Sequence, residues 1–126
     1  MCIEIFEFEL TVAADGTASV TSDAAYYGEI IRVELYSADS LANNGTIKGY
    51  EAGALTAVGS RQDFLNVTCA GSAVSKEVLP TIQRTDITGT AVASEYAPPV
   101  VAGKLTIAMA AHTETHVLNG RVYVKG

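Results

Sequence analysis

Apolar and polar residues alternate along several short stretches of the chain, and this alternation predicts β-strands. In residues 3–12 every second side chain is apolar: Phe6, Phe8, Leu10 and Val12. The positions between them carry acidic or hydroxyl side chains, so the segment predicts a strand with one buried face. An Asp15-Gly16 pair follows and predicts a tight hairpin turn into a short return strand over 17–22.

A second clear strand is predicted over residues 29–36. Its buried face is expected to carry Ile31, Val33 and Leu35, and its wetter face starts at Ile30 and continues through the polar positions that follow. Shorter strands are predicted around 46–50, 63–69 and 83–89, with 71–76 as a connection between two of them. The stretch 51–61 is rich in small residues and fits either a loop or a short helix.

The C-terminal stretch has the clearest pattern. Residues 104–110 alternate, with Leu105, Ile107 and Met109 on one face, and residues 121–125 carry a second alternating run. A polar segment, 111–120, separates the two runs, so they predict a β-hairpin with a long tip.

No long segment has a sustained helical period, and turn signals recur about every ten residues. This spacing predicts an all-β fold: an antiparallel β-sandwich that is jelly-roll-like, with an immunoglobulin-like sandwich as the alternative. A chain of 126 residues makes one domain, residues 1–126.

Composition and charge narrow the possible partners. Apolar residues make up 48% of the chain, and the net charge is −6, with nine acidic and two basic residues in positions 1–60. An acidic chain repels phosphate backbones, so we expect no nucleic-acid partner. No apolar run approaches the roughly 20 residues that span a bilayer, so we expect no membrane partner. The N-terminal residues lack the basic start of a signal peptide, which favours synthesis in the cytoplasm.

The only histidine cluster is His112-Thr113-Glu114-Thr115-His116. In an extended strand His112, Glu114 and His116 would share one face and could ligate Zn²⁺ or Ni²⁺. The segment lies in the predicted hairpin tip, however, so a solvated polar loop is favoured and no metal or other cofactor is expected.

No other pattern predicts an enzyme, because the chain lacks a nucleophile elbow, a phosphate-binding glycine loop and a dinucleotide fingerprint. A carbohydrate-binding module that uses Tyr26, Tyr27 and Tyr50 is the alternative outside the structural proteins; tyrosines in the core or an interface are the simpler reading. The high apolar fraction with few charges predicts a large docking surface or an oligomer.

Most of residues 17–124 resembles the small β-sandwich structural proteins of tailed bacteriophages that are encoded among the head genes. The matching stretches, in chain order, are 17–21, 28–35, 44–47, Pro80 to Arg84, Thr88-Gly89, Pro99-Val100-Val101-Ala102-Gly103-Lys104-Leu105 and Gly120-Arg121-Val122-Tyr123-Val124. One feature departs from the family pattern: the final tip is usually glycine-rich, whereas here it is 112–118.

The resemblance implies a head decoration (cement) protein in the virion, on the capsid surface. Such a protein binds the assembled head, bridges neighbouring subunits of the major capsid protein and is often a homotrimer. A head-fibre, neck or tail-associated protein is the alternative within the virion.

Two segments are the expected contacts of a decoration protein. Residues 1–8 form a possible docking strand, with Ile3, Ile5, Phe6, Glu7 and Phe8 as its contact residues. The alternative is that this segment is the first strand of the core. The second expected contact is the tip, through His112 and His116.

Overall fold

The computed structural model describes residues 2–53, 63–85, 88 and 90–126. Within these ranges the chain forms eleven strands and no helix. The strands are β1 (Ile3–Thr11), β2 (Ala18–Thr21), β3 (Tyr26–Ser37), β4 (Thr46–Glu51), β5 (Leu65–Thr68), β6 (Val74–Val78), β7 (Ile82–Thr85), β8 (Ala91–Ala97), β9 (Val100–Gly103), β10 (Leu105–Ala110) and β11 (Val117–Lys125). The described residues accordingly include no helix of the length and apolarity needed to cross a membrane.

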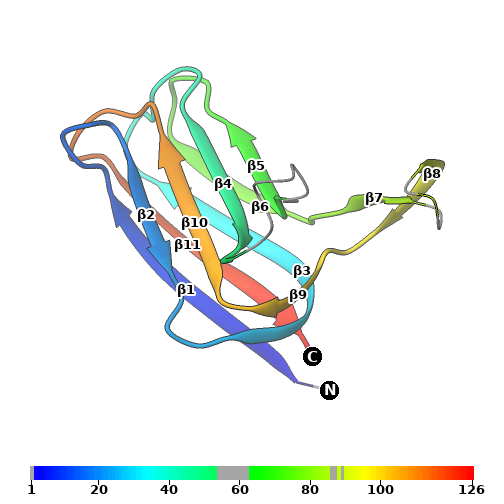
Figure 1. Ribbon diagram of the computed structural model, residues 1–126. Coiled ribbons are helices and arrows are strands. Elements are labelled where there is room, and N and C mark those ends of the chain that lie inside the picture. The colour runs from blue at the N-terminus through cyan, green and yellow to red at the C-terminus, as the bar shows by residue number, and fades with distance from the viewer. Residues whose placement is uncertain (1, 54–62, 86–87, 89) are drawn as a thin grey trace.

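Two antiparallel sheets pack face to face (Figure 1). Sheet A has the order β1-β11-β3-β6, with β9 also paired to the start of β3, and sheet B has the order β2-β10-β4-β5. The pairs β1·β11, β2·β10, β3·β6 and β4·β5 are the rungs of one long antiparallel ribbon. Pairing of β11 with β3 and of β10 with β4 rolls this ribbon into two sheets, which is the jelly-roll arrangement.

The strand order confirms the predicted antiparallel sandwich of jelly-roll type. The immunoglobulin-like alternative is wrong, because the first two strands of that fold share a sheet, whereas β1 and β2 lie in different sheets.

The core lies between the sheets and is built from the inward faces that alternation predicted. Phe6, Phe8 and Leu10 of β1 are all buried, while Glu7 and Glu9 point outward. Burying one such apolar side chain stabilises the fold by roughly 1.5–3 kcal/mol. The largest side chains that are almost fully buried are Ile30, Leu41, Ile47, Leu65, Leu105, Ile107, Met109 and Leu118.

The prediction that Ile31 is buried was wrong, because β3 contains a bulge. Tyr123 of β11 pairs with Arg32, and the next residue, Val124, pairs with Ile30, so Ile31 has no partner in the register. The bulge reverses the face on which the side chains before it lie. Ile30 is therefore completely buried, and Ile31 is only half-buried.

Both predicted hairpins were also wrong. The turn at Asp15 exists, and its carboxylate accepts hydrogen bonds from the Thr17 N–H (3.1 Å) and hydroxyl (2.8 Å). It leads, however, from β1 in sheet A to β2 in sheet B. The tip at 111–116 likewise joins β10 of sheet B to β11 of sheet A, so both segments are corners of the jelly roll.

Three strands fall where the sequence pattern gave a connection or no prediction. Strand β6 occupies part of the predicted connection, 71–76, and strands β8 and β9 were not predicted. Each of these strands is short or lies at a sheet edge, so its two faces do not alternate clearly. Most of 51–61 lies outside the described residues.

Strands β7 and β8 pair with each other and, in the described part of the chain, with no other strand. Figure 1 shows this two-stranded arm extending away from the sandwich. The chain ends lie side by side at the end of sheet A near the base of the arm, since Val100 and Lys125 both pair with Glu29. There the Gly126 N–H donates to the Cys2 carbonyl oxygen (3.0 Å).

We expect Gly120→Ala to lower the free energy of unfolding by about 1–3 kcal/mol, because the position is overpacked. A Cβ atom at residue 120 would overlap the Phe8 ring of the paired strand and lie 2.8 Å from the Glu34 carbonyl oxygen. Denaturant titration measures the loss. The control is Gly103→Ala, where the nearest atom to an added Cβ is Glu51 Cγ at an ordinary 3.5 Å. Equal effects at the two positions would contradict the packing argument.

Candidate functional site

The outer face of sheet A carries its side chains in ordered rows, because four strands pair there in a continuous register. Two of these rows lie side by side. The charged row runs across the strands as Glu7, Arg121, Glu34 and Glu77. The polar row runs parallel to it as Glu9, Asn119, Tyr36 and Ser75.

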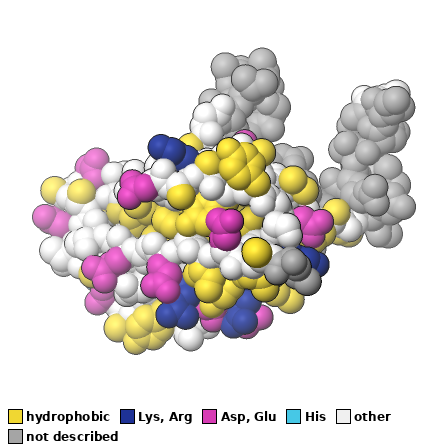
Figure 2. Space-filling view, turned by 90° about the horizontal axis from the view of Figure 1, so that it is seen from below, with side chains coloured by type: hydrophobic (Ala, Val, Ile, Leu, Met, Phe, Trp, Pro, Cys, Tyr) yellow, Lys and Arg dark blue, Asp and Glu magenta, His cyan; other side chains and the backbone are white. Residues whose placement is uncertain are grey.

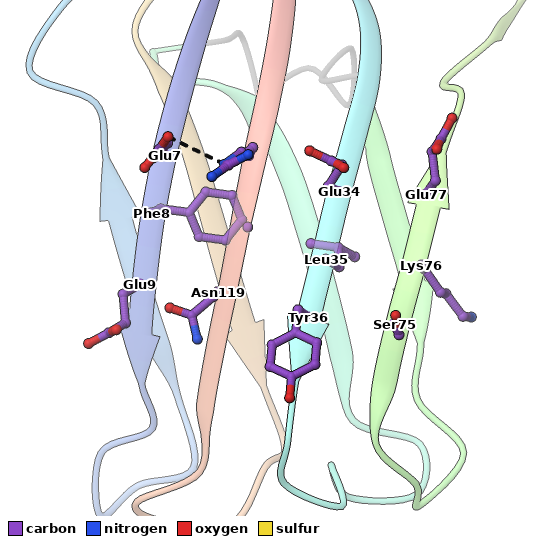
Figure 3. Close-up of a pocket in the computed structure, with 12 residues that line it drawn as sticks. Glu7, Phe8, Glu9, Glu34, Leu35, Tyr36, Ser75, Lys76, Glu77 and Asn119 are labelled. Carbon is purple, nitrogen blue, oxygen red and sulfur yellow. Dashed lines mark ion pairs between the residues drawn. The ribbon is translucent and has the colours of Figure 1, made fainter.

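The two rows border a hollow of about 810 Å³, which we call the polar hollow. Phe8, Gly120, Leu35 and Lys76 lie between the rows and complete its lining. Figure 3 shows Glu7, Glu34 and Glu77 at one level of the sheet and Glu9, Asn119 and Tyr36 at the next.

Arginines neutralise the charged row. Arg121 Nε lies 3.3 Å from Glu7 Oε1, and Arg32 bridges two carboxylates, at 2.8 Å from Glu34 and 3.2 Å from Glu77. The Arg32 guanidinium also lies over the Tyr123 ring, 5.2 Å from its centre. The row is thus a nearly neutral network, although three of its four members are acidic.

Tyr123 sets the ionisation of this network. Its hydroxyl donates a short hydrogen bond to Glu34 Oε1. This bond, together with the nearby positive charge of Arg32, lowers the pKa of Glu34. Glu34 therefore stays a carboxylate to a lower pH than an ordinary glutamate.

The same face becomes apolar toward the chain ends. Ile3 (54% exposed), Ile5 (45%), Tyr27 (67%) and Val100 (72%) form what we call the apolar end. The register places Ile3 and Val100 in one row across the sheet, with Lys125 and Glu29 between them. Seen from below, hydrophobic side chains gather across the surface among acidic and basic ones (Figure 2). Clustered exposed apolar side chains of this kind mark contact surfaces.

Strand β1 also offers a free edge. It pairs with β11 over nine residues, and no other strand of the described chain pairs with its second edge. A free edge can accept a strand from another molecule. β1 carries Glu4, Glu7 and Glu9 and no basic residue, so such a strand would have to be neutral or basic.

The predicted contact residues of the N-terminal segment divide between two roles. Ile3, Ile5 and Glu7 are exposed on the outer face, whereas Phe6 and Phe8 are 8% and 7% exposed and belong to the core. The segment is thus the first core strand and, at the same time, an edge with an exposed face. Met1 lies outside the described residues.

The predicted tip contacts lie at the other end of β1, where the Val12 N–H donates to the His116 carbonyl oxygen (2.9 Å). Nine strand residues span about 30 Å, so the tip and the apolar end are separate surfaces. The tip is not a solvated loop throughout. His112 is buried against Gly45, and its Nε2 lies 2.9 Å from the Thr46 carbonyl oxygen.

The tip does not have the extended geometry on which the metal hypothesis depended. Glu114 is exposed in a turn, next to Thr115 with φ of 72°. Among residues 2–53, 63–85, 88 and 90–126, no three His, Cys, Asp or Glu side chains are grouped to hold a metal ion. His112 instead joins the tip to the loop before β4.

The three tyrosines considered for sugar binding do not meet. Tyr26 packs on Phe6, with ring centres 6.1 Å apart, Tyr27 lies in the apolar end, and Tyr50 is on sheet B. The tyrosine that lines a hollow is Tyr36, which sequence reasoning placed on a wet strand face without assigning it a role. Its neighbours come from three other strands, so only the strand pairing could reveal them.

The chain was also compared with known proteins. No protein-family model and no curated protein matches it. It is similar to the virus-like particle of the extra small virus of the prawn Macrobrachium rosenbergii: identity 8%, TM-score 0.34, covering 97% of this chain and 77% of that one. It is also similar to infectious bursal disease virus, Gx strain: identity 13%, TM-score 0.27, covering 96% and 32%. At these TM-scores neither likeness carries an argument, and the jelly-roll assignment depends on the strand order.

We expect Tyr123→Phe to lower the melting temperature at neutral pH and to have little effect in acid. The hydroxyl bond lowers the pKa of Glu34 in the folded protein, so it stabilises the fold above the usual Glu pKa of 4.5, and this stabilisation is lost as pH falls through the lowered value. Thermal unfolding from about pH 7 to about pH 3 measures the difference. The phenylalanine keeps the ring over Arg32, so a difference that did not change with pH would contradict the role of the hydroxyl.

Proposed function

We propose that this protein is a virion structural protein that decorates an assembled viral head and stabilises it by bridging neighbouring capsid subunits. The observation that carries the proposal is the apolar end beside the free edge of β1. Ile3 and Ile5 lie on β1 itself, so one partner can bury their apolar area and pair its backbone with the edge of the strand.

Two further features support this role. The sequence resembles phage head proteins, and the jelly roll is a fold in which viral capsid domains occur.

The arm supports a bridging role in particular. A two-stranded hairpin by itself is marginally stable in water, and β7–β8 has no third strand in the described chain. Leu79 and Tyr96, at the base of the arm, are 66% and 60% exposed. An arm of this kind gains stability when a neighbouring subunit covers it.

The mechanism would be a binding equilibrium and no chemical reaction. A protein that binds only the expanded shell stabilises that state by RT ln(1 + [L]/Kd) for each site. The partner would be the major capsid protein, and the place of action the outer surface of the virion.

Co-sedimentation tests the proposal, with shells of the virus that encodes this chain, prepared without the protein. We expect the protein to sediment with expanded shells and to stay in the supernatant with unexpanded ones. The double variant Ile3→Ser, Ile5→Ser should weaken binding at least about tenfold through lost apolar burial. Tyr36→Ala is the matched control, since it removes an exposed apolar ring at the other end of the same face. Failure of the unaltered protein to sediment with either shell would rule the proposal out.

The oligomeric state is a separate prediction. We propose a homotrimer, in which the arm of each copy is covered by a neighbouring copy and the apolar end stays free for the capsid. Light scattering behind a sizing column should give a mass near three times 13.1 kDa at micromolar concentration. A mass of one chain at every concentration would contradict a trimer that forms before shell binding.

A further inference from the structure

We propose that the polar hollow is a binding site for a neutral saccharide, with Tyr36 as the platform on which a sugar ring stacks. This site is separate from the apolar end that carries the proposed capsid contact. It therefore does not depend on the capsid role and is tested separately from it.

The geometry of the polar row provides the platform. Asn119 pairs directly with Tyr36 on one side and with Glu9 on the other, so the three side chains stand next to one another on the sheet. The Tyr36 side chain is 56% exposed within a hollow of about 810 Å³. That size falls in the range of small-molecule sites, about 300–1,000 Å³.

The polar groups of this row are available to a ligand. The structure records no hydrogen bond or ion pair for the side chains of Glu9, Asn119 or Tyr36 within the part of the chain it describes. A carboxylate presents two hydrogen-bond acceptors side by side, and an amide presents an acceptor beside a donor. Both arrangements suit the adjacent hydroxyls of a sugar ring. A tyrosine ring supplies the apolar surface for the ring face.

The charge of the lining selects a neutral ligand. Phosphates and other anions are disfavoured, because four carboxylates line the hollow against the two cations Lys76 and Arg121. Cations are disfavoured too, because Arg121 and Arg32 already pair with Glu7, Glu34 and Glu77 and offset all but one of their charges. Only Glu9 and Lys76 remain outside these ion pairs, and their charges are opposite. A ligand with many hydroxyls and no net charge fits this lining best.

Titration of the ¹⁵N-labelled protein with neutral hexasaccharides of glucose, mannose, galactose and N-acetylglucosamine tests the proposal, with spermine and a sulfated hexasaccharide as charged probes. The site is open on one side, so we expect a Kd of about 0.1–1 mM for at least one neutral probe. The shifted backbone signals should lie at residues 34–36, 75–77 and 119–121.

Variants of two exposed tyrosines on the same strand distinguish specific binding in the polar hollow from nonspecific binding to exposed aromatic rings. Tyr36→Ala should weaken binding at least about tenfold, and Tyr36→Phe, which keeps the stacking surface, should retain it. Tyr27→Ala is the matched control and should bind like the unaltered protein, because Tyr27 is exposed outside the hollow. Binding of the charged probes alone, binding unchanged by Tyr36→Ala, or no binding to any probe would each overturn the proposal. The Ile3→Ser, Ile5→Ser protein should keep saccharide binding, so the two proposals can fail independently.

Discussion

The pairing of β11 between β1 and β3 is the constraint on which the rest of this structure depends. On its inner side β11 contributes Leu118, Val122 and Val124 to the core, all essentially fully buried. Its register with both neighbours also fixes which outward side chains meet across the sheet. A shift of one residue would turn the apolar face outward, so the core holds the outer rows in place. Both candidate surfaces on sheet A are consequences of how the core packs.

The local pattern of the chain was enough to predict the strands that have one buried face. β1 and β10 alternate without interruption, and Phe6, Phe8, Ile107 and Met109 lie inward as predicted. Their partners could not be predicted, because alternation defines faces and says nothing of neighbours. The turn after β1 has the residues of a hairpin turn, yet it joins two sheets, since β11 and β10 are the strands that pair with β1 and β2.

The sequence predicted candidate surface residues only where they all lie on a single strand. Ile3, Ile5 and Glu7 follow from the alternation of β1, and they are exposed as a contact surface requires. The polar hollow draws on four strands that are far apart in the chain, from Glu9 to Asn119. The bulge at Ile31 made the predicted buried face wrong for the first part of β3, because one extra residue reverses the face on which the preceding side chains lie. No periodicity in the sequence marks that position.

The charges of β1 explain how an exposed edge and an apolar surface can coexist in one chain. Copies of β1 brought edge to edge would bring the acidic residues Glu4, Glu7 and Glu9 of the two strands near one another, with no basic residue on the strand to offset them. Like charges across a strand pair destabilise it, so the edge is protected from pairing with its own copy. The net charge of −6 adds a general repulsion between molecules. A partner strand with neutral or basic residues meets no such barrier, and the same glutamates that keep the protein from aggregating would therefore select its partner.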